Sequence, residues 1–227
     1  MKIYISESHV KHINEAMKDG FRLDMLTAAS SFLEMEMYCR RMLGEPIGVG
    51  SSRIVFQIDD EVCLKLAKNE KGIAQNKEEI MIAATTKIRF IPKIYNGTDE
   101  ENGKWIITQY VIPATEMDFR KTIGMDFAEI YNFIYAQNVR FGSNDRLSVA
   151  MAEMTINSIR AKYSKNRMAT RLLNDIYKLK KSYNQLIGDA SRIENWGMAL
   201  ENGRPCMVIL DSGCSEEIFN KYYRNFW

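Results

Sequence analysis

Histidine and cysteine, the residues of many metal and nucleophile sites, are scarce in this sequence. The 227 residues include two histidines and four cysteines, and no two cysteines form a CxxC pair. This scarcity argues against a metal site with several histidine ligands, and against a serine or cysteine triad with a histidine base. The scattered cysteines are expected to be reduced and mostly buried.

Long apolar runs and a one-sided charge are absent as well. No segment contains the roughly 18 consecutive apolar residues that cross a bilayer, and the opening MKIYISESHV lacks the apolar run of a signal peptide. Basic residues number 31 and acidic residues 29, which gives a formal net charge of +2. We therefore expect no general attraction to nucleic acid or to membranes, and we expect a cytoplasmic protein.

The order of the predicted elements indicates an α+β protein with two lobes. Residues 23–43 have apolar residues at helical spacing and predict one helix, after a shorter helix that ends before Gly20. Strand signals follow up to residue 112, interrupted by one helix. Residues 126–186 predict three helices with one apolar face each, and a hairpin and a final helix end the chain. We divide the chain into a helical extension at 1–44, a lobe with a small antiparallel sheet and one helix at 45–112, and a reduced helical lobe at 113–227.

A glycine-containing segment, GVGSSR, precedes the predicted strand IVFQI. Gly48 and Gly50 allow backbone N–H groups to approach an anion, and the hydroxyls of Ser51 and Ser52 add further donors. The segment is not a Walker loop, because the GK[ST] ending is missing. A plain hairpin turn is the simpler interpretation of the segment when it is taken alone.

A lysine lies in the middle of the next predicted strand, VCLKLA. The alternation of side chains along a strand directs Lys65 to one face of the sheet. A lone strand lysine usually faces solvent. It gains a binding role if a carboxylate of the following helix contacts it, and Glu78 and Glu79 both lie in that helix.

Three oxygen-bearing side chains lie around the predicted hairpin near the end of the chain. Asp189 and Asn195 precede it, and Asp211 follows its second, very apolar strand, CMVIL. Carboxylate and amide oxygens suit hard cations such as Mg²⁺, and a carboxylate such as that of Asp189 can accept a proton from an attacking hydroxyl or orient it. Taken singly, each of the three also fits a turn or a helix cap.

In their order along the chain, these segments resemble the protein-kinase-like superfamily, including its small and divergent bacterial and phage members. The resemblance extends from about residue 47 to residue 214. For the first lobe it implies that the segment from Gly48 to Ser52 covers the phosphates of ATP. It further implies that Lys65, held by Glu79 or, with a shifted register, by Glu78, binds the α- and β-phosphates.

For the rest of the chain, the resemblance implies a hinge from residue 109 to residue 112, where Gln109 and Val111 contact the nucleotide. It also implies that Asn195 and Asp211 hold Mg²⁺, and that Asp189 positions the hydroxyl of the acceptor. If a phage encodes the protein, the cytoplasm in question is that of the host.

The sequence departs from the family pattern at several positions. Ile187-Gly188-Asp189 replaces the family's HRD, and Asp211-Ser212-Gly213 replaces DFG. Six positions separate Asp189 from Asn195, one more than in the family, and a shifted alignment would put Ala190 at the position of the base. Arg192 is a possible compensating cation. Only fourteen residues follow Gly213, so we expect no activation loop after it.

Three functions are compatible with this pattern. The first is an ATP- and Mg²⁺-dependent phosphotransferase that acts on a hydroxyl of a protein or of a small molecule. The second is a pseudokinase, which binds a nucleotide or serves as a scaffold without catalysis. The third is a phage structural or host-interaction protein that contacts a partner through residues 1–44. Of these, we favour the phosphotransferase.

Overall fold

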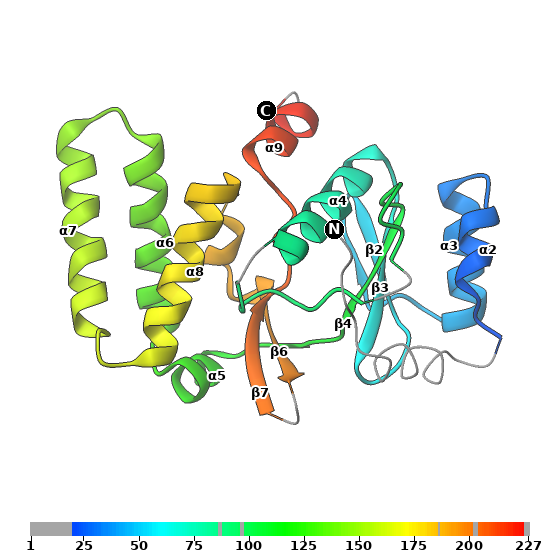
Figure 1. Ribbon diagram of the computed structural model, residues 1–227, viewed down its shortest axis with the longest axis horizontal. Coiled ribbons are helices and arrows are strands. Elements are labelled where there is room, and N and C mark those ends of the chain that lie inside the picture. The colour runs from blue at the N-terminus through cyan, green and yellow to red at the C-terminus, as the bar shows by residue number, and fades with distance from the viewer. Residues whose placement is uncertain (1–19, 86–87, 96–97, 186, 202–203, 225–227) are drawn as a thin grey trace. The chain divides into compact units, whose positions relative to one another are not determined.

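The computed structural model describes residues 20–85, 88–95, 98–185, 187–201 and 204–224 (Figure 1). These residues belong to two compact units. The first unit takes its described residues from Met1–Thr86, Lys93–Tyr110 and Ile218–Trp227, and the second takes them from Lys87–Pro92 and Val111–Glu217. The short helix predicted before Gly20 lies outside the described residues.

The first unit contains a four-stranded antiparallel sheet. Its order is β1-β2-β3-β4, with β1 at Gly48–Val49, β2 at Arg53–Gln57, β3 at Val62–Ala67 and β4 at Trp105–Gln109. The side chain of Asp59 closes the turn between β2 and β3, because it accepts hydrogen bonds from the N–H groups of Glu61 and Val62 at 2.7 and 2.8 Å. Lys65 occupies the middle of the sheet, since it pairs with Val55 of β2 and Ile106 of β4.

The N-terminal helices share a hydrophobic core with this sheet. Helix α2 spans Leu23–Ala28 and helix α3 spans Phe32–Leu43. Leu26, Met35 and Cys39 of these helices form one buried cluster with Leu64 and Leu66 of β3. Leu64 and Leu66 alternate along the strand with Lys65, which therefore lies on the other face of the sheet. The methionines of this segment serve different roles, because Met35 is buried whereas Met25 and Met37 are exposed.

The prediction of one helix over residues 23–43 was wrong, because the helix is interrupted. The side chain of Ser31 accepts a hydrogen bond from the Glu34 N–H at 3.2 Å, which makes Ser31 the N-cap of α3. The neighbouring hydroxyl of Ser30 donates to the Glu34 carboxylate. The apolar spacing continues across these two serines, so the periodicity alone does not indicate the break.

Helix α4, at Glu70–Thr85, lies against β3 and β4 (Figure 1). Asn69 precedes it and accepts a hydrogen bond from the Gly72 N–H at 3.1 Å, the bond that a capping residue makes. Gly72 allows a very close approach to the sheet: a Cβ atom there would lie 2.2 Å from the carbonyl oxygen of Ser52 and 3.1 Å from Cα of Ala67. Helix α4 is therefore held tightly against the strands that carry Arg53 and Lys65.

The second unit is mainly helical. Its longer helices are α6 at Phe127–Gly142, α7 at Arg146–Lys162 and α8 at Arg167–Tyr183. A short helix, α5 at Glu116–Asp118, and a π-helical turn at Phe119–Ile123 precede them. A three-stranded sheet has the order β5-β6-β7, with β5 at Ile112–Pro113, β6 at Trp196–Glu201 and β7 at Arg204–Ile209. Helix α9, at Glu216–Tyr222, begins in the second unit and belongs to the first from Ile218 onward.

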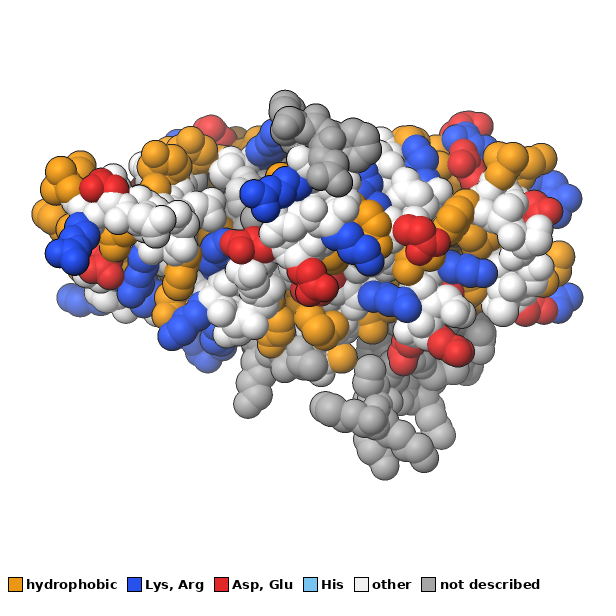
Figure 2. Space-filling model, turned by 90° about the horizontal axis from the view of Figure 1, so that it is seen from above, with side chains coloured by type: hydrophobic (Ala, Val, Ile, Leu, Met, Phe, Trp, Pro, Cys, Tyr) orange, Lys and Arg blue, Asp and Glu red, His pale blue; other side chains and the backbone are white. Residues whose placement is uncertain are grey.

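Hydrophobic side chains are exposed on helix α7. Leu147, Met151 and Met154 follow one another at helical spacing and are 61 to 72% exposed. Figure 2 shows hydrophobic side chains gathered at its left end, over this helix.

The α+β class predicted from the sequence is confirmed, with a small antiparallel sheet and the helices α2, α3 and α4 in the first unit and mainly helices in the second. The short elements β1, β5 and α5 were not predicted. Within the described part of the chain, no helix is both long and apolar enough to span a bilayer.

Candidate active site

A buried ion pair joins strand β3 to helix α4. Lys65 Nζ lies 2.8 Å from Glu79 Oε2, and the two residues are only 7% and 5% exposed. The sequence left both Glu78 and Glu79 as partners, and the helix directs Glu79 to the lysine. The simpler interpretation of Lys65 as a solvent-facing strand residue is therefore wrong.

A second cation, missed by the sequence interpretation, binds the same carboxylate. Arg53 Nη1 lies 2.7 Å from Glu79 Oε1, and it also donates to Asn76 Oδ1 at 3.3 Å. Arg53 is 7% exposed. The register of the sheet contains a signal for this contact, because Val55 pairs with Lys65 and Arg53 lies two residues before Val55 on the same face.

The polar face of α4 is also joined to the rest of the first unit by hydrogen bonds. The Ser52 hydroxyl donates to Gln75 Oε1, and Asn76 Nδ2 donates to the carbonyl of Gly103 at 2.9 Å. Gln75, Asn76 and Glu79 are all buried. Buried polar groups are costly unless they are hydrogen-bonded, so these bonds fix the orientation of the helix that carries Glu79.

The glycine segment forms the tight turn between β1 and β2. The Gly50 N–H donates to the carbonyl of Arg53 at 2.8 Å, as a hairpin turn requires. Residues at the start of α4 also contact the turn: Lys71 Nζ donates to the Ser51 hydroxyl and Asn69 Nδ2 to the Ser51 carbonyl, both at 3.2 Å. The simpler interpretation, a hairpin turn, thus describes the backbone, and it leaves a phosphate-binding role of these residues open. The Ser52 hydroxyl already has a protein acceptor.

The predicted hinge contains the point where the chain passes from the first unit to the second. Gln109 ends β4 and is buried, and its N–H donates to the carbonyl of Lys93 at 2.9 Å. The middle segment of the first unit ends at Tyr110, and the second unit resumes at Val111. Val111 packs closely against Gly197 of β6, where an added Cβ would lie 2.9 Å from its side chain.

In the second unit, two 3-10 turns hold the segment from Asp189 to Asn195. The turns span Asp189–Ser191 and Ile193–Asn195. Asn195 Nδ2 donates to the backbone carbonyl of Asp189 at 2.9 Å, and the indole N–H of Trp196 donates to that of Ala190 at 2.8 Å. Since Trp196 is fully buried, it anchors this segment to the core.

The carboxylates of Asp189 and Asp211 lie close enough to influence each other. The Leu210 N–H donates to the carbonyl of Asn195 at 2.9 Å, which places Asp211 next to the Asp189–Asn195 segment. The pKa of Asp189 is raised, mainly by burial and further by repulsion from Asp211, whereas Arg192 lowers it. Ala190, the other position considered for the base, is buried and has no carboxylate, whereas the carboxylate of Asp189 lies near Asp211.

Asn195 and Asp211 fit a divalent cation that is bound partly by the protein and partly by the phosphates of a ligand. Among the described residues, no group of three or more His, Cys, Asp or Glu side chains could hold a metal ion. Magnesium is commonly bound through one or two carboxylates together with substrate phosphates, so a full protein cage is not required. Asp211 and the amide of Asn195 supply oxygen ligands of the right kind for that mode of binding.

The elevated pKa of Asp189 provides a test of this arrangement. Because the folded pKa exceeds the ordinary value of 3.8, the contribution of this group to stability falls as the pH rises from 3.8 through the folded pKa. In the metal-free protein, Asp211→Asn is expected to lower the pKa of Asp189 without restoring it to 3.8, because burial persists. Carboxyl titration by NMR measures this shift. An unchanged Asp189 pKa in the variant would show that the two carboxylates do not interact.

The chain was compared with known proteins. No protein-family model matches it, and no curated protein does. Among solved structures, it is similar to a chain of the streptomycin-ATP-APH(2″)-IIa ternary complex. The sequence identity is 12%, the TM-score is 0.34, and the match covers 93% of this chain and 72% of the other. Values this low do not decide the family or the function of the protein.

Proposed function

We propose that the protein is a phosphotransferase that uses ATP and Mg²⁺ to phosphorylate a hydroxyl group. The observation that carries this proposal is the buried ion pair between Lys65 and Glu79. A lysine in a central strand and a glutamate in the following helix are the pair that protein kinases use to hold the phosphates of ATP. Burying this pair is costly, and a binding function explains why the charges are kept.

Each predicted residue has a role in this proposal. Lys65 would bind the α- and β-phosphates, Glu79 would orient it, and the turn from Gly48 to Ser52 would contribute backbone N–H groups. Gln109 and Val111 would contact the nucleotide base. Ser51 is better suited than Ser52 to add a hydroxyl, because the Ser52 hydroxyl is bonded to Gln75.

The roles in the second unit follow from its oxygen ligands. Asn195 and Asp211 would hold Mg²⁺, which neutralises charge on the phosphates when it is bound. Asp189 would accept the proton of the acceptor hydroxyl, and its raised pKa brings it nearer to the pH at which a general base is effective. Arg192 lies close enough to lower that pKa, so it is a candidate for stabilising negative charge on the transferred group.

Calorimetric titration with ATP, with and without Mg²⁺, tests the proposal. We expect binding that requires Mg²⁺ and that Lys65→Ala and Asp211→Ala each weaken by about tenfold or more, as the loss of a charged contact does. Lys77→Ala and Glu217→Ala remove an exposed charge from the same units and serve as matched controls. Absence of binding at millimolar ATP or GTP would overturn the proposal. Binding without any phosphate transfer would instead indicate the pseudokinase.

A further inference from the structure

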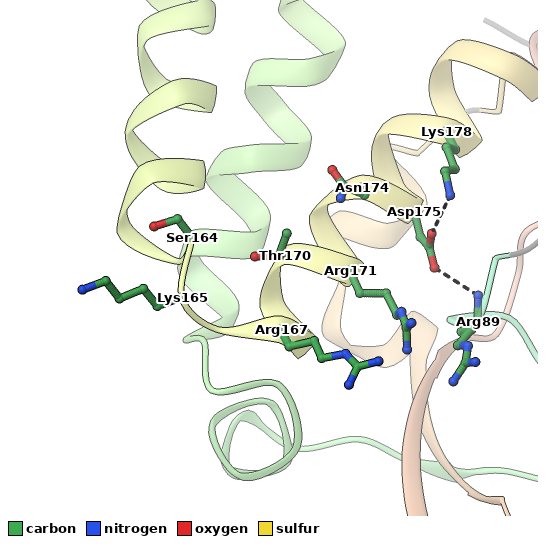
Figure 3. A pocket seen from close by; sticks show the side chains of 9 residues that line it. All are labelled: Arg89, Ser164, Lys165, Arg167, Thr170, Arg171, Asn174, Asp175 and Lys178. Atoms are coloured by element: carbon green, nitrogen blue, oxygen red, sulfur yellow. Dashed lines mark hydrogen bonds and ion pairs between the residues drawn. The ribbon is translucent and has the colours of Figure 1, made fainter.

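The second unit contains a pocket of about 620 Å³ that is separate from the residues considered above. Its walls come from the first half of helix α8, the loop before that helix and the short segment around residue 89 (Figure 3). The lining residues are Arg89, Ser164, Lys165, Arg167, Thr170, Arg171, Asn174, Asp175 and Lys178. Asp189, Asn195 and Asp211 are not among them.

The pocket is strongly cationic. Five of its lining residues are lysine or arginine, and one is acidic. That acidic residue, Asp175, is buried and already occupied, because it accepts a hydrogen bond from the Arg89 backbone N–H at 3.0 Å and lies 3.5 Å from Lys178 Nζ. The carboxylate therefore fixes the wall of the pocket and neutralises Lys178, and it leaves the three arginines without compensation from the lining.

Three arginine side chains extend to the same side of the pocket. Figure 3 shows the guanidinium groups of Arg167 and Arg171 directed toward the region where Arg89 ends, whereas Lys165 points away. Arg167 and Arg171 are one helical turn apart on α8, and Arg89 comes from a segment about 80 positions earlier in the chain. Within the described residues, none of the three forms an ion pair.

The position of these charges on the helix is unfavourable without a ligand. Arg167 is the first residue of α8, and the first turn contains no acidic residue. The N-terminus of a helix carries a partial positive charge, which repels cations and attracts anions. Asn166 caps the helix by accepting from the N–H groups of Met168 and Ala169, at 3.0 and 3.1 Å. A bound anion would offset the remaining repulsion between Arg167 and the partial positive charge of the helix N-terminus.

We propose that this pocket binds a small molecule that carries one or more phosphate groups. Guanidinium groups form paired hydrogen bonds with phosphate oxygens, and three of them from two chain segments can surround one such group. The amide of Asn174 adds a neutral donor to the lining. The volume lies in the range of small-molecule sites, and the formal net charge of +2 for the whole chain does not favour an extended polyanion such as nucleic acid.

Calorimetry with inorganic pyrophosphate, in the absence of Mg²⁺, tests this site on the whole protein. We expect the wild type to bind it, and because the proposed nucleotide site requires Mg²⁺, binding without Mg²⁺ reports on the pocket. Arg89→Ala and the pair Arg167→Ala with Arg171→Ala are each expected to weaken binding by about tenfold or more. Arg89→Ala keeps the backbone N–H that donates a hydrogen bond to Asp175, so the pocket wall should remain folded.

Two further variants separate a built site from general charge attraction. Arg171→Lys keeps the charge and loses the paired donors, so it should bind pyrophosphate several times more weakly. Arg146→Ala removes an exposed charge from α7 and should leave binding unchanged. The proposal is overturned if all the arginine variants bind like the wild type, if Arg171→Lys and Arg146→Ala behave alike, or if citrate binds more tightly than pyrophosphate.

Discussion

Replacing Glu79 with alanine is expected to lower the free energy of unfolding by about 3 to 5 kcal/mol, the range for removing one partner of a buried ion pair. The carboxylate lies between Lys65 Nζ at 2.8 Å and Arg53 Nη1 at 2.7 Å, and all three residues are buried. Its loss would leave two buried cations without the carboxylate that they share. Urea unfolding followed by circular dichroism measures the change.

The neighbouring glutamate provides the matched control for this experiment. Glu78→Ala removes the same group one residue earlier on α4, where the side chain is half-buried rather than buried like that of Glu79. Its effect is expected to be well below that of Glu79→Ala. Lys65→Met should also cost less, because Glu79 then keeps Arg53 as a partner. If Glu79→Ala and Glu78→Ala unfolded at the same urea concentration, the central ion pair would contribute nothing to stability.

Asp189→Asn is expected to reduce the rate of ATP turnover by about a hundredfold to ten-thousandfold, the range for loss of a general acid or base. Asparagine keeps the size of the side chain and cannot accept the proton. The expectation rests on the proposed function, and ADP release under saturating ATP and Mg²⁺ measures it. Release of ADP needs no knowledge of the acceptor, because water can replace it.

The same variant should retain its affinity for ATP. Asp189 is not among the residues proposed to bind the nucleotide, and its replacement removes repulsion from Asp211. Glu194→Gln, an exposed change in the same loop, is expected to leave turnover unaffected. Full turnover by Asp189→Asn, measured beside an inactive Asp211→Ala, would exclude Asp189 as the base while leaving nucleotide binding intact.

The elements with strong local signals could be predicted from the sequence. The strands around Lys65 and the three long helices of the second unit follow from periodicity, and their order along the chain indicated a pairing of Lys65 with a helix glutamate. The break in the N-terminal helix could not be predicted from apolar spacing, because that spacing continues from the end of α2 at Ala28 past Ser31, the N-cap of α3.

Contacts between distant segments were harder to predict. Arg53 directly follows the glycine turn, and in the sequence it reads only as the last residue of GVGSSR. The strand register places it on the same face of the sheet as Lys65. The cationic pocket joins Arg89 to Arg167 and Arg171, and a single sequence contains no signal that brings these segments together. The sequence shows that each of these side chains is a cation, but it does not show which residues from distant segments lie next to it.

Helix α4 contacts the sheet through hydrogen bonds and ion pairs, which depend on the direction of each side chain. These contacts fix the register of the helix against the strands. Gly72, Gln75, Asn76 and Glu79 follow one another at helical spacing, so one face of the helix makes the close approach, the bonds to the strands and the ion pairs. A slip of one residue would rotate that face by about 100° and break all of these contacts together. A single register of the helix therefore satisfies the close approach, the hydrogen bonds and the ion pairs together.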